Sequence, residues 1–149
     1  MNKIDPNSLV DPKFIGIPYV LSGKTFEGSD CIGACLLWLK DQGVEYEYDD
    51  GMGPIMNHWW EHNPKRFINA FLMAGNIVRF SQLKKYDCVL LLGAEISTFP
   101  SCVGVMVDDR HFLMSIPGRG SFVQMMNQFW KLKTVSSIRL HKVIERYGL

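Results

Sequence analysis

Cys31 stands in the sequence context best suited to nucleophilic chemistry in this 149-residue chain. It follows a glycine-containing stretch and opens an apolar-periodic segment, in the order SGKTFEGSDCIGACLLWLK. A thiol at the amino end of a helix lies beside unpaired amides and the positive end of the helix dipole, which stabilise a thiolate. Tyr19, just upstream, could offer a hydroxyl to an oxyanion. Cys31 is therefore a candidate nucleophile, and the alternative is a packed small hydrophobe.

A nucleophilic thiol needs a base, and four histidines are candidates. His111 stands three residues before Met114 in a predicted strand, so alternation places the two side chains on opposite faces; the alternative is an exposed hairpin histidine. His58 and His62 have the i, i+4 spacing of some zinc ligands, but the HExxH order is absent and no third ligand is indicated. That pattern favours a surface or groove-lining pair. His141 is predicted to point outward from a strand.

Two helices are predicted in the first half of the chain. The first begins near Asp30, with Ser29 or Asp30 as its cap, and ends before Gly43. The second has Asn63 as its cap and Pro64 as its first helical residue, and it ends before Gly75. Because apolar residues recur at helical spacing in both segments, each helix should bury one face.

Short apolar runs separated by turns follow position 78 and indicate strands. Strands are predicted in CVLLLG, SCVGVMV, HFLMSI and SSIRLHKVI, whereas FVQMMNQFWKL is ambiguous between strand and helix. The order predicts an α+β fold in which the first helix packs on an antiparallel sheet. Residues 1–15 are expected to form an N-terminal arm, and residues 16–149 a single domain.

Composition excludes several classes of protein. A net charge of +1 provides no field to attract nucleic acid or an anionic membrane. No signal peptide or membrane-spanning run is recognised, so we expect synthesis in the cytoplasm and no membrane insertion, unless a larger particle carries the protein out. The four cysteines form no CxxC pair, which argues against a zinc ribbon, and no metal or cofactor is expected.

The stretch GIPYVLSGKTFEGSDCIGACLLWLKDQG resembles the nucleophile segment of the NlpC family, papain-like cysteine peptidases that cut bacterial cell-wall peptides. The family pattern runs Pro-Tyr, a glycine pair, a spacer and Gly-x-Asp-Cys-x-Gly before a helix. The matching residues are Pro18, Tyr19, Gly23, Gly28, Asp30, Cys31 and Gly33. Ser22 replaces one of the paired glycines. The resemblance implies a papain-like NlpC-type fold over residues 14–145.

Two further segments carry the resemblance and also depart from it. LKKYDCVLL resembles the Leu-x-x-Gly-Asp start of a family strand, with Tyr86 in place of glycine. CVGVMVDDRHFLMS resembles the base-bearing hairpin, with Cys102 in place of the base histidine and Met114 in place of the residue that orients it. Neither a neutral thiol nor a thioether can hold the nucleophile as a thiolate or protonate the leaving amine. The resemblance thus implies a domain that has lost its catalytic relay.

The same resemblance implies that Cys102 faces Cys31 across the cleft, and three interpretations stay open. The two residues could pack as free thiols, form a disulfide, or bind a metal together with Cys35. Cys88 lies inside an apolar strand and is expected in the core.

The aromatic residues could line a groove for a sugar or peptide, form a contact patch for another protein, or pack in the core. For Trp38 and Trp130, the sequence favours core packing and a groove or contact surface equally. The adjacent pair Trp59 and Trp60 is harder to bury on both sides, so we expect it to bind a partner.

Three functions follow. The first is a non-catalytic structural or binding part, such as a baseplate or hub component of the kind the resemblance suggests in the tail tips of long-tailed bacteriophages, with partners among the proteins of that assembly or in peptidoglycan. Such a part would be incorporated into a virion. The second is an active endopeptidase that cleaves peptidoglycan stem peptides through Cys31, with His111 or another base. The third is acyl transfer on lipid or amide substrates. The sequence leaves open whether the chain is an enzyme.

Overall fold

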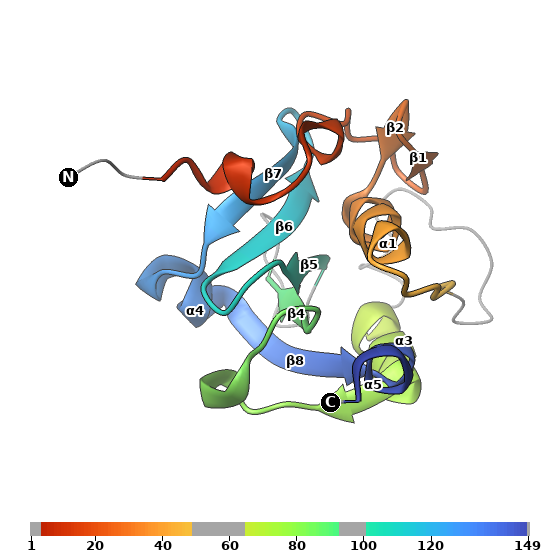
Figure 1. Ribbon diagram of the computed structural model, residues 1–149, viewed down its shortest axis with the longest axis vertical. Helices are drawn as coiled ribbons and strands as arrows, with labels where there is room; N and C mark the ends of the chain where they lie inside the picture. The colour runs from red at the N-terminus through yellow and green to blue at the C-terminus, as the bar shows by residue number, and fades with distance from the viewer. Residues whose placement is uncertain (1–3, 49–64, 93–100, 149) are drawn as a thin grey trace.

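The computed structural model describes residues 4–48, 65–92 and 101–148. Its centre is a six-stranded sheet in which every pair of neighbours is antiparallel (Figure 1). In order across the sheet, the strands are β3 (Gly75–Ile77), β8 (Thr134–Leu140), β4 (Cys88–Leu91), β5 (Cys102–Met106), β6 (His111–Ile116) and β7 (Gly120–Met125). A separate two-stranded ribbon joins β1 (Lys24–Thr25) to β2 (Gly28–Ser29).

Four α-helices and three short 3-10 turns surround the sheet in the described residues. The helices are α1 (Cys31–Asp41), α3 (Arg66–Ala74), α4 (Gln128–Lys133) and α5 (His141–Tyr147), and the turns are η1 (Pro6–Leu9), η2 (Pro12–Phe14) and η3 (Phe80–Gln82). Helix α1 packs against β5 and β6, while α3 and α5 lie beside β3 and β8 at the other end of the sheet (Figure 1). This is the predicted α+β architecture. Over the described ranges, no helix has the length and apolar character needed to cross a bilayer.

Helix α1 begins and ends where its sequence signals predict. The Asp30 carboxylate accepts a hydrogen bond of 2.7 Å from the Gly33 amide, which satisfies a free donor of the first turn. Beyond the last turn, Gly43 takes a positive φ of 87°, a conformation that favours glycine. The helix buries Ile32, Cys35 and Leu39 on one face against the sheet, so its helical periodicity reflects real packing.

The core lies around the two central strands. Every residue of β4 and β5 is buried, which requires cover on both faces of the sheet at this point. Phe112 and Leu113 of β6 are both fully buried on opposite faces of their strand, which agrees with that cover. Cys88 is buried in β4, as predicted, and Trp38 of α1 is buried as well.

The structure corrects two boundaries near the carboxyl end. The segment FVQMMNQFWKL is ambiguous because it contains both the end of β7 and the start of α4, separated by Asn127, whose side chain accepts from the Trp130 amide at 3.1 Å. The predicted final strand is too long, because β8 ends at Leu140 and the following residues form α5. His141 is therefore the exposed first residue of a helix and not an outward strand residue. The second predicted helix ends before Gly75 as expected; its predicted start at 63–64 lies outside the described residues.

Residues 4–15 run along β7, the last strand of the sheet. The Val123 amide donates to the Asn7 side chain at 2.9 Å, and the Ser121 hydroxyl donates to the Phe14 carbonyl at 2.6 Å. Phe14 itself is buried in the core. These contacts attach the start of the chain to its own sheet.

Candidate functional site

A cavity of about 400 Å³ lies at the amino end of α1, where that helix meets the sheet and α4. We call it the Cys31 cavity. Its walls are formed by Tyr19, Cys31, Leu92, Ser101, Cys102, Met114, Ser115, Ile116, Pro117, Phe129, Trp130 and Lys133. Residues from six separate parts of the chain therefore meet at one place.

Four residues singled out from the sequence line this cavity together: Tyr19, Cys31, Cys102 and Met114. Cys31 is the first residue of α1, Cys102 opens β5 and Met114 lies in β6. Tyr19 precedes the two-stranded ribbon and forms an isolated bridge with Ser29. The other predicted binding residues, at 59–60, lie outside the described residues, as do two of the candidate histidines, at 58 and 62.

The Cys31 thiol is almost completely buried and hydrogen-bonded to the thiol of Cys102. That hydrogen bond raises the pKa of Cys31 well above its ordinary value, burial raises it further, and the nearby Asp30 carboxylate adds to the rise. A hydrogen bond from the Val103 backbone amide opposes the shift without reversing it. Burial and the contact with Cys102 thus oppose the thiolate-stabilising effect of the helix amino terminus and favour the protonated thiol of Cys31.

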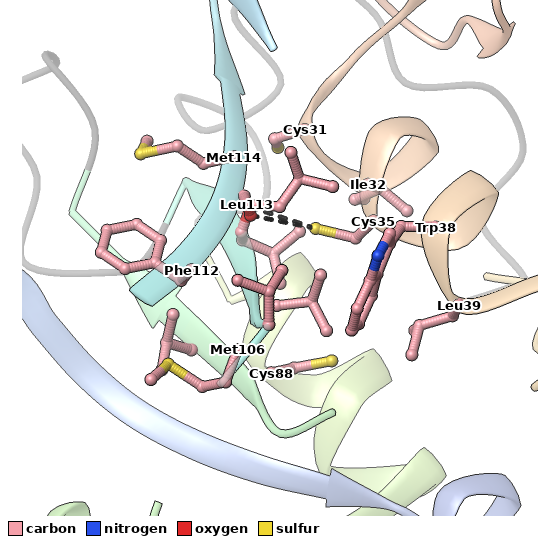
Figure 2. Packing of buried hydrophobic residues seen from close by; sticks show 14 of the residues in the cluster. Cys31, Ile32, Cys35, Trp38, Leu39, Cys88, Met106, Phe112, Leu113 and Met114 are labelled. Carbon is pink, nitrogen blue, oxygen red and sulfur yellow. Dashed lines mark hydrogen bonds between the residues drawn. The ribbon is translucent and has the colours of Figure 1, made fainter. Parts of the chain in front are cut away.

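The second thiol of α1 also meets β5. Cys35 donates to the carbonyls of Val103 and Leu113 at 3.7 and 3.8 Å, and Cys102 donates to Val103 at 3.9 Å. Figure 2 shows Cys35 and Met114 on opposite sides of β6. All four cysteines are free thiols. Among the described residues, no group of three or more histidine, cysteine or acidic side chains is arranged to hold a metal ion.

The glycines before Cys31 allow the helix to approach the ribbon closely. A Cβ atom built on Gly33 would lie 2.1 Å from the Gly23 carbonyl oxygen, so only glycine fits at that helical position. Asp30 connects the same parts, because one carboxylate oxygen accepts from the Gly33 amide and the other from the Ser22 amide at 3.0 Å. Burial raises the pKa of Asp30 above 3.8, although these two hydrogen bonds oppose the rise.

Both departures from expected glycines keep a glycine-like backbone. Ser22 has a φ of 62° and Tyr86 a φ of 80°, and they are the non-glycine residues with positive φ in the described part of the chain. Tyr86 stacks on Tyr147 with a centroid separation of 4.3 Å and also contacts Trp38. Its ring contacts give the side chain a role in packing that glycine could not have.

His111 lies away from the Cys31 cavity. It is the first residue of β6, whereas the cavity is lined by residues 114–116 at the other end of that strand. Its Nδ1 lies 3.0 Å from a carboxylate oxygen of Asp108 in the preceding turn. No described residue that lines the cavity carries an imidazole or a carboxylate.

Helix α4 contributes a wall of the cavity that the sequence indicated only in part. Phe129, Trp130 and Lys133 reach the cavity from this six-residue helix; Trp130 was a candidate groove residue, whereas Phe129 and Lys133 were not predicted. A local signal was present, since Asn127 is a good helix cap, but the strand pattern of the preceding residues concealed it. Trp130 also packs edge-on against Phe112, which fixes α4 on the sheet.

Known structures share this fold. An NlpC/P60 family protein from Bacillus cereus aligns with a TM-score of 0.59 and 19% identity over 93% of this chain and 41% of its own. A lipoprotein-like NLP/P60 family protein from Staphylococcus aureus aligns with a TM-score of 0.54 and 14% identity over 86% of this chain and 38% of its own. The NlpC/p60 domain of the peptidoglycan hydrolase SagA aligns with a TM-score of 0.56 and 21% identity over 87% of this chain and 92% of its own.

The chain is therefore an NlpC-type, papain-like domain in fold, as the sequence resemblance implies. It spans about two fifths of the length of the first two proteins and nearly all of the third domain. Neither a protein-family model nor a curated protein sequence matches the chain. At these identities the likeness concerns the fold, and activity has to be argued from the site.

Proposed function

We propose that this domain is a non-catalytic relative of the NlpC-type peptidases that acts as a binding or structural component. The observation that carries the proposal is the contact between Cys31 and Cys102, where the resemblance places a histidine. A thiol paired with a neutral thiol has no group to accept its proton. Its raised pKa leaves very little thiolate at neutral pH.

The leaving group poses a second difficulty for catalysis. Amide cleavage requires a general acid to protonate the departing amine, and in papain-like sites the imidazolium supplies that proton. The cavity-lining residues in the described ranges provide thiols, hydroxyls and the Lys133 ammonium. Met114, in place of the orienting residue, can neither orient a base nor hold its charge.

Digestion of purified peptidoglycan tests this proposal. We expect the wild-type protein to release no more peptide than Cys31→Ala, as measured by liquid chromatography and mass spectrometry. The double variant Cys102→His/Met114→His is the matched gain-of-function control, since it returns two imidazoles to the cavity. Release of peptide by the wild type that Cys31→Ala abolishes, with both proteins folded, would establish an active endopeptidase and overturn the proposal.

We also propose that the domain serves in a larger assembly, such as the tail tip or baseplate hub of a bacteriophage. The support is the resemblance to stand-alone domains of that kind, together with exposed apolar side chains beside the Cys31 cavity. Phe129 is 59% exposed and Leu132 is 74% exposed on α4. Mass spectrometry of intact phage particles from cells that encode this chain should detect it as a constituent, and its absence from such particles would contradict this role.

A further inference from the structure

We infer that the Cys31 cavity binds a small apolar carboxylate, a molecule with a hydrocarbon body and one anionic end. The inference rests on the proposed function, because a cleft that does not catalyse cleavage can bind a ligand and leave it intact. It is carried by two independent features of the cavity: its apolar walls and a single cation beside them.

The walls suit a hydrocarbon body. Small-molecule sites are concave, largely apolar and about 300–1,000 Å³ in volume, with a few polar groups that fix orientation. The Cys31 cavity measures about 400 Å³ and has these properties. Its apolar lining comes from Leu92, Met114, Ile116, Pro117, Phe129 and Trp130, and the buried thiols add surface of the same character.

Lys133 supplies the only charge among the described lining residues. Its ammonium lies 5.3 Å from the centroid of the Phe129 ring, and that ring is more than half exposed, which places the charge at the mouth of the cavity. Within the described ranges, Lys133 forms no ion pair. A single ammonium beside an apolar cavity matches a monoanion, whereas a dianion such as a phosphate monoester would require further cations.

Isothermal titration calorimetry on the full chain tests this inference with three ten-carbon probes, each kept below its micelle concentration. Decanoate should bind saturably at one site. 1-Decanol and decyltrimethylammonium should bind at least about tenfold more weakly, since neither presents an anion to Lys133. Equal affinity for decanoate and the cationic probe would overturn the inference, as would the absence of saturable decanoate binding.

Matched variants locate the site. Lys133→Met should weaken decanoate binding about tenfold and leave decanol unchanged, because it removes charge and keeps side-chain length. Lys131→Met is the control, since Lys131 lies on the same helix outside the cavity and packs over Phe80. Ile116→Trp should fill the cavity and abolish binding, with circular dichroism confirming the fold.

Retained decanoate affinity in Lys133→Met or Ile116→Trp would overturn the inference, and so would an equal loss in Lys131→Met. These titrations contain no peptidoglycan. Their failure therefore leaves the proposed function standing, whereas peptide release in the digestion assay contradicts the proposed function alone.

Discussion

The thiol of Cys31 is hydrogen-bonded to the thiol of Cys102, at the first residue of α1 and the first residue of β5. A cysteine peptidase has an imidazole at the second of these positions, which makes the thiolate and imidazolium a stable pair. Here the second group is itself a weak acid. Because this contact and burial raise the pKa of Cys31, the Cys31 thiol keeps its proton and the contact does not form an ion pair.

Alkylation kinetics should reflect this contact directly. We expect Cys31 in the wild-type protein to react with iodoacetamide at neutral pH far more slowly than a free cysteine peptide, since burial and Cys102 raise its pKa. Cys102→His should accelerate the reaction at Cys31 by at least about tenfold, because an imidazole lowers the pKa of a neighbouring thiol. Peptide mapping by mass spectrometry assigns the modified residue.

Cys102→Ser is the control for that experiment, since it removes the second thiol without adding a base and should not produce the same acceleration. Fast alkylation of Cys31 in the wild-type protein would contradict the raised pKa and reopen an active nucleophile.

Gly33 should be irreplaceable even by alanine. Glycine to alanine in a helix interior normally stabilises by about 1 kcal/mol. At Gly33, however, the new Cβ would lie 2.1 Å from the Gly23 carbonyl oxygen, a rigid backbone atom. We therefore expect Gly33→Ala to lower the free energy of unfolding by about 3 kcal/mol or more in urea denaturation. Separation of α1 from the ribbon would also alter the Cys31 cavity.

Gly118→Ala is the matched comparison for Gly33. A Cβ there meets open space, but the φ of 81° disfavours alanine. We expect Gly118→Ala to lower the free energy of unfolding by about 1–2 kcal/mol, from the backbone conformation alone. Equal effects at the two positions would show that the close approach at Gly33 is not what makes glycine necessary.

Local signals explain how much of this fold could be predicted. The start of α1 is encoded within four residues, because Asp30 caps the amide of Gly33, and the sequence alone identified it. The end of β8 is different, since SSIRLHKVI alternates like one strand although α5 begins at His141. Val143 is buried by tertiary packing against the sheet, and period-2 alternation in the sequence cannot distinguish that from a continuing strand.

The residues of the Cys31 cavity also differ in whether the sequence could predict them. Cys31, Cys102 and Met114 could be brought together because a resemblance aligned two long motifs with a known arrangement. Lys133 and Phe129 had no motif, and their place in the cavity depends on how α4 folds back after β7. No sequence pattern predicts this contact between α4 and the distant segments that line the cavity, so only the three-dimensional structure identifies it.

The raised pKa of Asp30 predicts how the free energy of unfolding depends on pH. Because burial raises its folded pKa above 3.8, its contribution to stability is fully present below the unfolded pKa and is lost as pH rises through the folded pKa. The free energy of unfolding of the wild-type protein should therefore fall relative to Asp30→Asn as pH rises from about 4 towards neutrality. Urea denaturation of both proteins at several pH values measures this difference.

Asp108 provides a control of opposite sign. Partial burial would raise its pKa, but hydrogen bonds from the Arg110 amide and from the ring and amide of His111 outweigh burial and lower it below 3.8. Its contribution is present above the unfolded pKa and is lost as pH falls through the folded pKa. Wild type should therefore lose stability relative to Asp108→Asn on acidification below about pH 4. If the free energy of unfolding, relative to each Asp→Asn variant, changed with pH in the same direction for Asp30 and Asp108, the opposite pKa shifts assigned to them would be contradicted.

The ion pair between Asp87 and Arg139 should be the most sensitive charged contact of the sheet. Asp87 has no exposed surface, and its two oxygens accept from Arg139 at 2.8 and 2.9 Å, which joins the start of β4 to β8. Arg139→Met would leave that carboxylate buried without its cation, so we expect a loss of about 3–5 kcal/mol in the free energy of unfolding. Lys142→Met is the control: it breaks the exposed contact with Glu145 at 3.8 Å and should lower that free energy by less than about 1 kcal/mol. Similar losses for the two variants in urea denaturation would mean that solvent screens the Asp87 pair as well, and that burial does not protect it.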